Sequence, residues 1–213
     1  MSFKKNKYTI LKKAISPELA NFVYKYFLNK RNTARFLFDQ KYLSPFNTEY
    51  GVWNDAQVPN TYSHYSDIAM ETLLHEVKPV MEKHTGIKLS PTYSYARIYK
   101  KGDVLVRHKD RYSCEISTTL NLGGESWPIY LDPTGKTGQA GIEVNLNPGD
   151  MLIYSGCELE HWREEFKGKD CGQVFLHYNK SNSKIAKENY LDKRPILGAP
   201  SWFKGVKLTK IKK

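Results

Sequence analysis

The sequence contains little cysteine and no long apolar run, and both absences narrow the class of protein. Its three cysteines, Cys114, Cys157 and Cys171, are odd in number and include no Cys-x-x-Cys pair, which argues against a disulfide framework and favours a reducing compartment. The apolar stretches are far shorter than the ~20 residues needed to cross a bilayer, and the N-terminus lacks the apolar core of a secretory signal. We therefore expect a cytoplasmic protein with no membrane association.

The residues that are present suit one folded domain. A chain of 213 residues with 40% apolar and 13% aromatic residues can build a core, which excludes a wholly disordered protein. The net charge of +11 lies at the two ends, because residues 1–13 and 180–213 together carry +13 and the stretch between them carries −2. Basic ends could hold nucleic acid through counterion release, but they are more often solvated tails. No oligomeric state is predicted.

Two helices are predicted in the first part of the chain. Ser16-Pro17-Glu18 is a helix-start signal, and the apolar residues that follow it at three- and four-residue steps should form one buried face: Leu19, Phe22, Val23, Tyr26 and Phe27. A second helix should run from Ser66 to about Thr85, with a kink at Pro79 and a left-handed stop at Gly86. Residues 32–65 lack a clear period and are predicted to form loops and short strands.

After residue 88 the pattern changes to short alternating or β-branched runs separated by glycine and proline. These runs predict eight strands, at 92–99, 104–108, 115–121, 127–131, 141–145, 150–154, 159–163 and 172–178. We predict a mostly β (α+β) fold, a jelly-roll core with the two helices packed outside one sheet. The expected organisation is a single domain: N-terminal helices and lid-like loops at 1–87, a jelly-roll catalytic core at 88–179, and a basic C-terminal extension at 180–213.

Three side chains form a candidate metal site. His108 and Asp110 stand at the end of a predicted strand, where the two-residue period sends both to the same side. His161 follows on a different predicted strand, after the hairpin that begins at Pro148-Gly149-Asp150. The isolated His-x-Asp pattern is usually a solvated turn. One carboxylate and two imidazoles on one face are, however, the ligand set of non-haem Fe(II) oxygenases.

The order of the surrounding motifs resembles the prolyl 4-hydroxylase-like branch of the 2-oxoglutarate/Fe(II) dioxygenases. A tyrosine strand from Tyr95, a glycine turn at Gly102, the His108-x-Asp110 pair, a Thr/Leu strand and a Pro-Gly-Asp hairpin before His161 follow in that family's order, over about residues 66–178. The resemblance implies a double-stranded β-helix core. It also implies Fe(II) bound by His108, Asp110 and His161, with 2-oxoglutarate and O₂ as cosubstrates and ascorbate as the reductant.

The resemblance also requires a cation for the distal carboxylate of 2-oxoglutarate, and two residues compete for that role. Lys169 stands near the family's usual position. Arg163 shares the inward face of His161 by strand parity, and its guanidinium matches a carboxylate bidentately, so it is slightly favoured. Tyr99 resembles the tyrosine that approaches the cosubstrate, and Gln173 is inward by parity and could hydrogen-bond it. His177 is an alternative to His161 as the distal ligand.

The implied activity is hydroxylation of an unactivated C–H, with a prolyl residue of a protein or peptide as the first choice of substrate. The same chemistry on a nucleic acid, a free amino acid or another small molecule stays open. Two alternatives belong to other classes. One is a non-catalytic jelly-roll binding module, and the other is a zinc hydrolase, for which Glu160 would be the general base although parity turns it outward.

Overall fold

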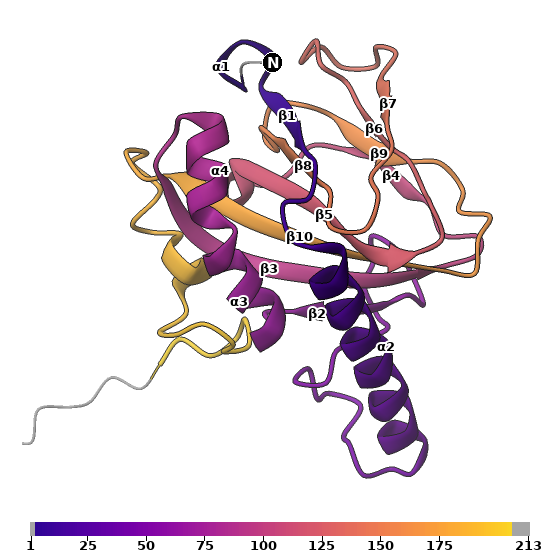
Figure 1. Ribbon diagram of the computed structural model, residues 1–213. Helices are drawn as coiled ribbons and strands as arrows, with labels where there is room; N and C mark the ends of the chain where they lie inside the picture. Colours follow the sequence, from indigo (N-terminus) through magenta and orange to yellow (C-terminus); the bar gives the residue numbers. More distant parts are fainter. Residues whose placement is uncertain (1–2, 206–213) are drawn as a thin grey trace, which may run out of the picture.

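Two antiparallel sheets form the body of the molecule in the computed structural model, which describes residues 3–205 (Figure 1). The major sheet has the order β1-β8-β5-β10-β3-β2 and the minor sheet β4-β9-β6-β7. The strands of the major sheet are β1 (Tyr8–Leu11), β2 (Tyr62–Tyr65), β3 (Leu89–Lys100), β5 (Ile116–Gly124), β8 (Met151–Tyr154) and β10 (Asp170–Lys180). Those of the minor sheet are β4 (Leu105–His108), β6 (Ile129–Leu131), β7 (Ile142–Val144) and β9 (His161–Arg163). The predicted mostly β, jelly-roll fold is confirmed.

The helices lie on the face of the major sheet that points away from the minor sheet (Figure 1). They are α1 (Phe3–Asn6), α2 (Pro17–Asp39), α3 (Ile68–Glu76) and α4 (Lys78–Thr85), and two short 3₁₀ helices span Tyr112–Cys114 and Tyr190–Lys193. β10 shows how the layers divide. Val174 and Leu176 pack toward the helices, whereas Cys171 and Phe175 pack with residues between the sheets. The space between the two sheets holds the candidate site.

The eight strands predicted after residue 88 are all present, with ends shifted by a few residues. One further strand, β1, was not predicted, and another, β2, lies in the stretch 32–65 where loops and short strands were expected. β1 pairs with β8, and β2 pairs with β3, so both are edge strands of the major sheet. Each has only four residues, too few to show a period in a basic or irregular stretch. The pairing with longer strands, rather than local sequence, therefore stabilises them.

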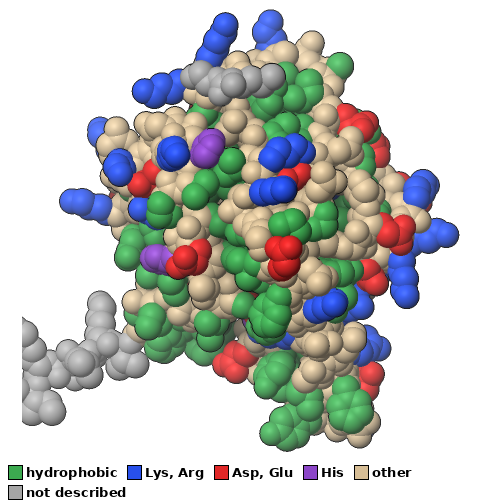
Figure 2. All heavy atoms as spheres, viewed as in Figure 1, with side chains coloured by type: hydrophobic (Ala, Val, Ile, Leu, Met, Phe, Trp, Pro, Cys, Tyr) green, Lys and Arg blue, Asp and Glu red, His purple; other side chains and the backbone are tan. Residues whose placement is uncertain are grey.

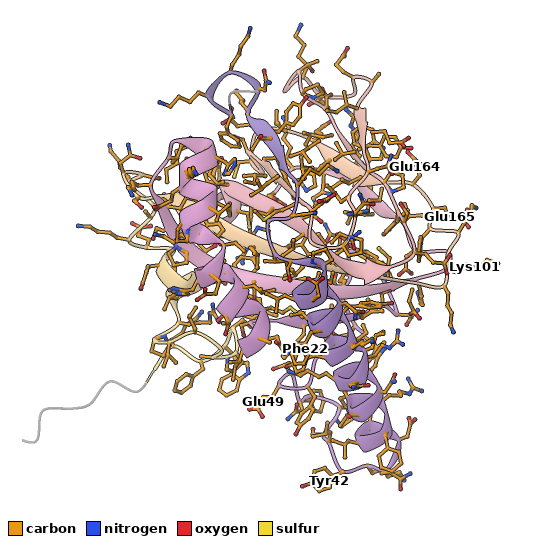
Figure 3. The ribbon with its side chains drawn as sticks, viewed as in Figure 1. Phe22, Tyr42, Glu49, Lys101, Glu164 and Glu165 are labelled. Carbon is orange, nitrogen blue, oxygen red and sulfur yellow. The ribbon has the colours of Figure 1, made fainter. Side chains whose placement is uncertain are left out.

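The helix predictions need three corrections. α2 runs to Asp39, so part of the stretch predicted as loops and strands is helical. Its expected buried face is wrong at Leu19 and Phe22, which are exposed; Phe22 lies on the outer side of α2 (Figure 3). The predicted second helix is in fact two helices, α3 and α4, which meet at Val77, two residues before Pro79. The N-cap of α3 is Asp67 rather than Ser66. Gly86 does adopt the left-handed stop conformation, with φ 68°.

The C-terminal extension packs on the body as far as the structure describes it. Ala186, Leu191, Arg194 and Ala199 are all buried. Residues 206–213, which carry part of the predicted basic tail, lie outside the described residues, as do residues 1–2. Between residues 3 and 205 no helix has the length and apolar character of a membrane span. The domain boundaries at 87/88 and 179/180 stay a prediction.

Candidate metal centre

The two sheets bring His108, Asp110 and His161 to one point. β4 and β9 are antiparallel neighbours, and His108 is directly opposite His161 in their register. Oδ1 of Asp110 lies 3.8 Å from Nε2 of His108 and 3.6 Å from Nε2 of His161. One ligand atom from each residue can be chosen so that all three lie within 4.8 Å of one another. The arrangement is compatible with a single ion bound on one face.

Both imidazoles present the same nitrogen to this point. Nδ1 of His108 donates to the carbonyl oxygen of Val106 at 2.7 Å, and Nδ1 of His161 donates to that of Leu159 at 3.2 Å. These bonds fix the tautomer in which Nε2 carries the lone pair, as in the histidine ligands of metal sites. Burial lowers the pKa of His161, which favours its neutral, ligating form.

Asp110 is held as a carboxylate by its neighbours. Burial opposes its charge, but the nearby imidazoles of His161 and His177 and a hydrogen bond from the Ser117 hydroxyl (2.7 Å) outweigh burial and lower its pKa. Its backbone N–H donates to the carbonyl of Gly156 at 2.9 Å. A Cβ at Gly156 would come within 2.3 Å of Oδ2 of Asp110, so only glycine leaves room for the carboxylate.

His108, Asp110 and His161 line a cavity of about 320 Å³ that opens to solvent. Its walls combine aromatic and apolar side chains with several charged ones: Asp55, Tyr93, Tyr95, Arg97, Leu105, Lys109, Arg111, Ile129, Tyr154, Phe175 and His177. A cavity of this size is at the lower end of the range for small-molecule sites. It could hold a small cosubstrate while a larger substrate approaches from outside.

Arg163 is a buried cation that has no carboxylate partner among residues 3–205. It is 1% exposed, its Nη1 donates to the carbonyl of Trp127, and its Nη2 lies 3.4 Å from Oγ1 of Thr119. Its Nε has no hydrogen-bond acceptor, and burial lowers the pKa of the guanidinium. A desolvated guanidinium with an unsatisfied N–H favours an anionic ligand. The N–H groups of the guanidinium can donate to the two oxygens of a carboxylate.

The other predicted cosubstrate residues divide into buried and exposed ones. Tyr99 is fully buried and packs edge-on against Trp127. Gln173 is buried and accepts from the Thr119 hydroxyl at 3.1 Å. Lys169 is exposed, and its backbone N–H donates to Glu125. Tyr99 and Gln173 therefore lie with Arg163 between the sheets, and Lys169 does not.

His177, the alternative ligand, and Glu160, the candidate general base, both lie away from the point where His108, Asp110 and His161 meet. His177 lies 3.0 Å from Oγ of Ser117 through its Nδ1, and so meets Asp110 only through that hydroxyl. Burial lowers the pKa of His177 to about 4. The carboxylate of Glu160 binds Arg107 and accepts from the N–H of Gly138. The outward orientation expected for Glu160 is thus confirmed.

The sequence reasoning missed three polar residues of the cavity. Arg97 on β3 is buried, and its Nη2 donates to Asp55 and, at 2.7 Å, to Oε1 of Gln57. The amide of Gln57 in turn donates to Nε2 of His108 at 3.1 Å. Strand parity offered a signal for Arg97, which has the same orientation as Tyr95 and Tyr99. No such signal existed for the loop residues Asp55 and Gln57.

Comparisons with known proteins identify the fold class. No protein-family model matches the sequence, and no curated protein matches it. Among solved structures, a Pseudomonas putida prolyl-4-hydroxylase is 11% identical, with a TM-score of 0.59 over 84% of this chain and 95% of that one. A Trichoplax adhaerens prolyl hydroxylase in complex with a hypoxia inducible factor peptide is 14% identical, with a TM-score of 0.59 over 90% of each chain. SnoN, a non-haem α-ketoglutarate-dependent epimerase from nogalamycin biosynthesis, is 13% identical, with a TM-score of 0.58 over 97% of this chain and 92% of that one.

The chain therefore has the jelly-roll fold of the 2-oxoglutarate-dependent oxygenases. At these identities the likeness defines the fold. The solved structures that share this fold thus agree with the family resemblance predicted from the sequence.

Proposed function

We propose that the protein is an Fe(II)- and 2-oxoglutarate-dependent oxygenase. The observation that carries the proposal is the convergence of His108, Asp110 and His161 in a cavity of this fold. Two neutral imidazoles and one carboxylate are the donor set that non-haem iron takes in such oxygenases, and three ligands on one face leave positions open toward the cavity. The buried guanidinium of Arg163, which meets no acid in the described part of the chain and has an unsatisfied Nε, supports a dicarboxylate cosubstrate.

Each residue has a definable task in this reaction. His108, Asp110 and His161 would bind the iron. Iron and 2-oxoglutarate together would supply the oxidative decarboxylation that activates O₂ for hydroxylation of a C–H bond, with ascorbate as the reductant that we predict.

Two residues between the sheets would hold the cosubstrate. Arg163 would bind the distal carboxylate of 2-oxoglutarate, and the Thr119 hydroxyl, which bridges Arg163 and Gln173, would orient it. Tyr99, Arg163 and Gln173 lie outside the cavity lining. The cavity would therefore have to extend toward Thr119 when 2-oxoglutarate binds. The aromatic walls would limit the access of water to the reacting atoms.

We propose a prolyl residue of a protein or peptide as the substrate. The likeness in fold to prolyl hydroxylases, one of them in complex with a peptide, supports this choice. The fold is shared with an epimerase from nogalamycin biosynthesis, so hydroxylation of a small molecule is the second candidate. No further observation favours a nucleic acid.

The test is release of succinate from 2-oxoglutarate in the presence of Fe(II) and ascorbate. The native chain should form succinate, and Asp110→Ala should reduce the rate to background because a metal ligand is lost. The matched control is Asp39→Ala, which removes an exposed carboxylate at the far end of α2 and should keep the native rate.

Two outcomes would contradict the proposal. Equal succinate formation by the native chain and Asp110→Ala would exclude these ligands. Absence of iron-dependent succinate from both, with the native chain folded, would favour the non-catalytic binding module. Hydrolysis of a test ester that depends on Zn²⁺ would instead favour the zinc hydrolase.

A further inference from the structure

The C-terminal segment is fixed beside the candidate site by a buried ion pair. Arg194 and Glu71 of α3 lie 2.6 Å apart, with side chains 0% and 1% exposed. Arg194 also donates to the carbonyl oxygens of Thr92 and Ala199. Because such a pair is costly to break, it holds the residues on either side of Arg194 in one place.

The residues just before this anchor have an unusual backbone. Leu191, Asp192 and Lys193 are consecutive non-glycine residues with φ of 48°, 53° and 64°. Left-handed conformations at non-glycine residues cost free energy. They persist where surrounding contacts stabilise them, and they are often found at functional sites. Here they place the carboxylate of Asp192 where it accepts from Tyr65 at 2.7 Å and from Arg111 at 3.2 Å. The segment thus contacts the loop that directly follows Asp110.

Arg111 joins the metal cavity to a second hollow. It lines the cavity, and it also lines a hollow of about 380 Å³ on its other side. The remaining walls of this second hollow come from the 3₁₀ helix after Arg111 and from the C-terminal segment: Tyr112, Ser113, Asn189, Asp192, Lys193 and Lys204. A ligand that filled both hollows would have to extend across Arg111, as a polypeptide several residues long can.

The surface formed by the walls of the two hollows carries more basic than acidic side chains. Asp192 compensates Arg111. Lys109, Lys193 and Lys204 have no carboxylate partner within residues 3–205, and the Nζ atoms of Lys109 and Lys204 contact only the carbonyl oxygens of Gly135 and Asp192. The second hollow, lined by Lys193 and Lys204, is therefore the complement of an acidic group.

We propose that this surface binds an acidic side chain of a polypeptide substrate, a few residues from the residue that enters the metal cavity. The inference rests on the proposed function. It adds that the substrate carries an acidic residue and that this residue lies on the side of the C-terminal segment. Lys193 and Lys204 both line the second hollow, and two cations match one or two carboxylates. A nucleic acid would require a longer basic stripe along its phosphates.

The test compares proline-containing peptides that differ only in flanking charge. Each peptide carries Asp, Gln or Lys at the flanking positions, and both binding of the labelled peptide and stimulated succinate release are measured. We expect the Asp peptide to bind roughly tenfold more tightly than the Lys peptide, with the difference shrinking as salt is added. Lys193→Glu combined with Lys204→Glu should abolish or reverse that order.

The matched control is Lys5→Glu combined with Lys184→Glu, which changes the net charge equally at exposed positions outside both hollows. This control should retain the preference for Asp. Equal binding of all three peptides, or equal loss of preference in both double variants, would overturn the inference. Tighter binding of an oligonucleotide of the same charge would overturn the choice of a polypeptide. If the native chain released no succinate either with or without peptide, the proposed function would be contradicted. The peptide-binding measurements would still test the preference for an acidic peptide.

Discussion

At the scale of single residues, Arg163 is the clearest sign that a ligand belongs between the sheets. A guanidinium in a protein interior normally meets a carboxylate, as Arg194 meets Glu71. Among the described residues, Arg163 donates to a carbonyl and a hydroxyl and stacks on the ring of Trp127, and its Nε–H remains unsatisfied. An anion in that place would supply the missing acceptors.

This gives a prediction about cosubstrate affinity. Arg163→Gln should raise the KM for 2-oxoglutarate by roughly ten- to a hundredfold, because a charge-assisted contact is lost. Lys169→Gln should change it little, since that side chain is exposed. Steady-state succinate assays at varied 2-oxoglutarate measure both. The reverse ranking of the two variants would assign the cation to Lys169.

His177 gives a prediction about pH. Burial lowers its pKa from 6.5 to about 4, so the unfolded chain takes up this proton at a higher pH than the folded chain does. Stability is therefore lost as the pH falls from 6.5 toward 4, by roughly 2–3 kcal/mol if His177 acts alone. Urea unfolding of the native chain and of His177→Gln at pH 7 and pH 4.5 should show a smaller loss in the variant. Parallel losses in both proteins would mean that His177 does not cause this pH dependence.

At the scale of elements, α2 shows why a periodic pattern can be assigned to the wrong face. Leu19 and Phe22 fit the helical period, yet Ala20, Val23, Phe27 and Ala34 form the buried face. The ring of Tyr24 lies over Gly123 and Gly172, where an added Cβ would come within 3.0 Å and 2.5 Å of it. The flat surface offered by these two glycines on neighbouring strands sets the rotation of the helix.

Hydrophobic side chains also gather at the free end of α2 and on the loop after it (Figure 2). Phe36, Tyr42 and Phe46 are among the exposed aromatic residues there.

The rotation of α2 can be tested with two phenylalanines of the same helix. Phe27→Ala should destabilise the protein by about 3–5 kcal/mol, because a fully buried ring that packs on Tyr62 is lost. Phe22→Ala should change stability by less than about 0.5 kcal/mol, since Phe22 is 70% exposed. Chemical denaturation measures both, and similar costs for the two variants would contradict this orientation.

At the scale of the whole molecule, the chain's last described part stabilises its first half. Glu71 on α3 accepts from Arg194 and from the N–H of Gly198, so the C-terminal segment covers α3 and β3. Part of the basic extension is thereby structural rather than a solvated tail.

We predict that Glu71→Gln costs about 3–5 kcal/mol, because it leaves the buried guanidinium without its charge partner. The double variant Glu71→Leu with Arg194→Leu should recover much of that loss, since it removes both charges. Unfolding free energies measure the difference, and hydrogen exchange should show that residues 190–205 open first in Glu71→Gln. A double variant less stable than the single one would argue against this account.

The sequence by itself determined the alternation of the eight strands, the order of the motifs and which three residues, His108, Asp110 and His161, were candidates for one metal site. These are local properties, because strand parity and turn residues act over a few positions. Parity also brought Arg163 and Gln173 to the inside, where the structure has them.

Only the tertiary structure decided which layer each element faces. Several features depend on partners distant in sequence: the register that sets His108 opposite His161, the rotation of α2, the edge strands β1 and β2, the contact of Gln57 with His108 and the contact of Asp192 with Arg111. Such contacts are fixed by packing and by the pairing of buried polar groups, which carry no local period that a sequence pattern could reveal.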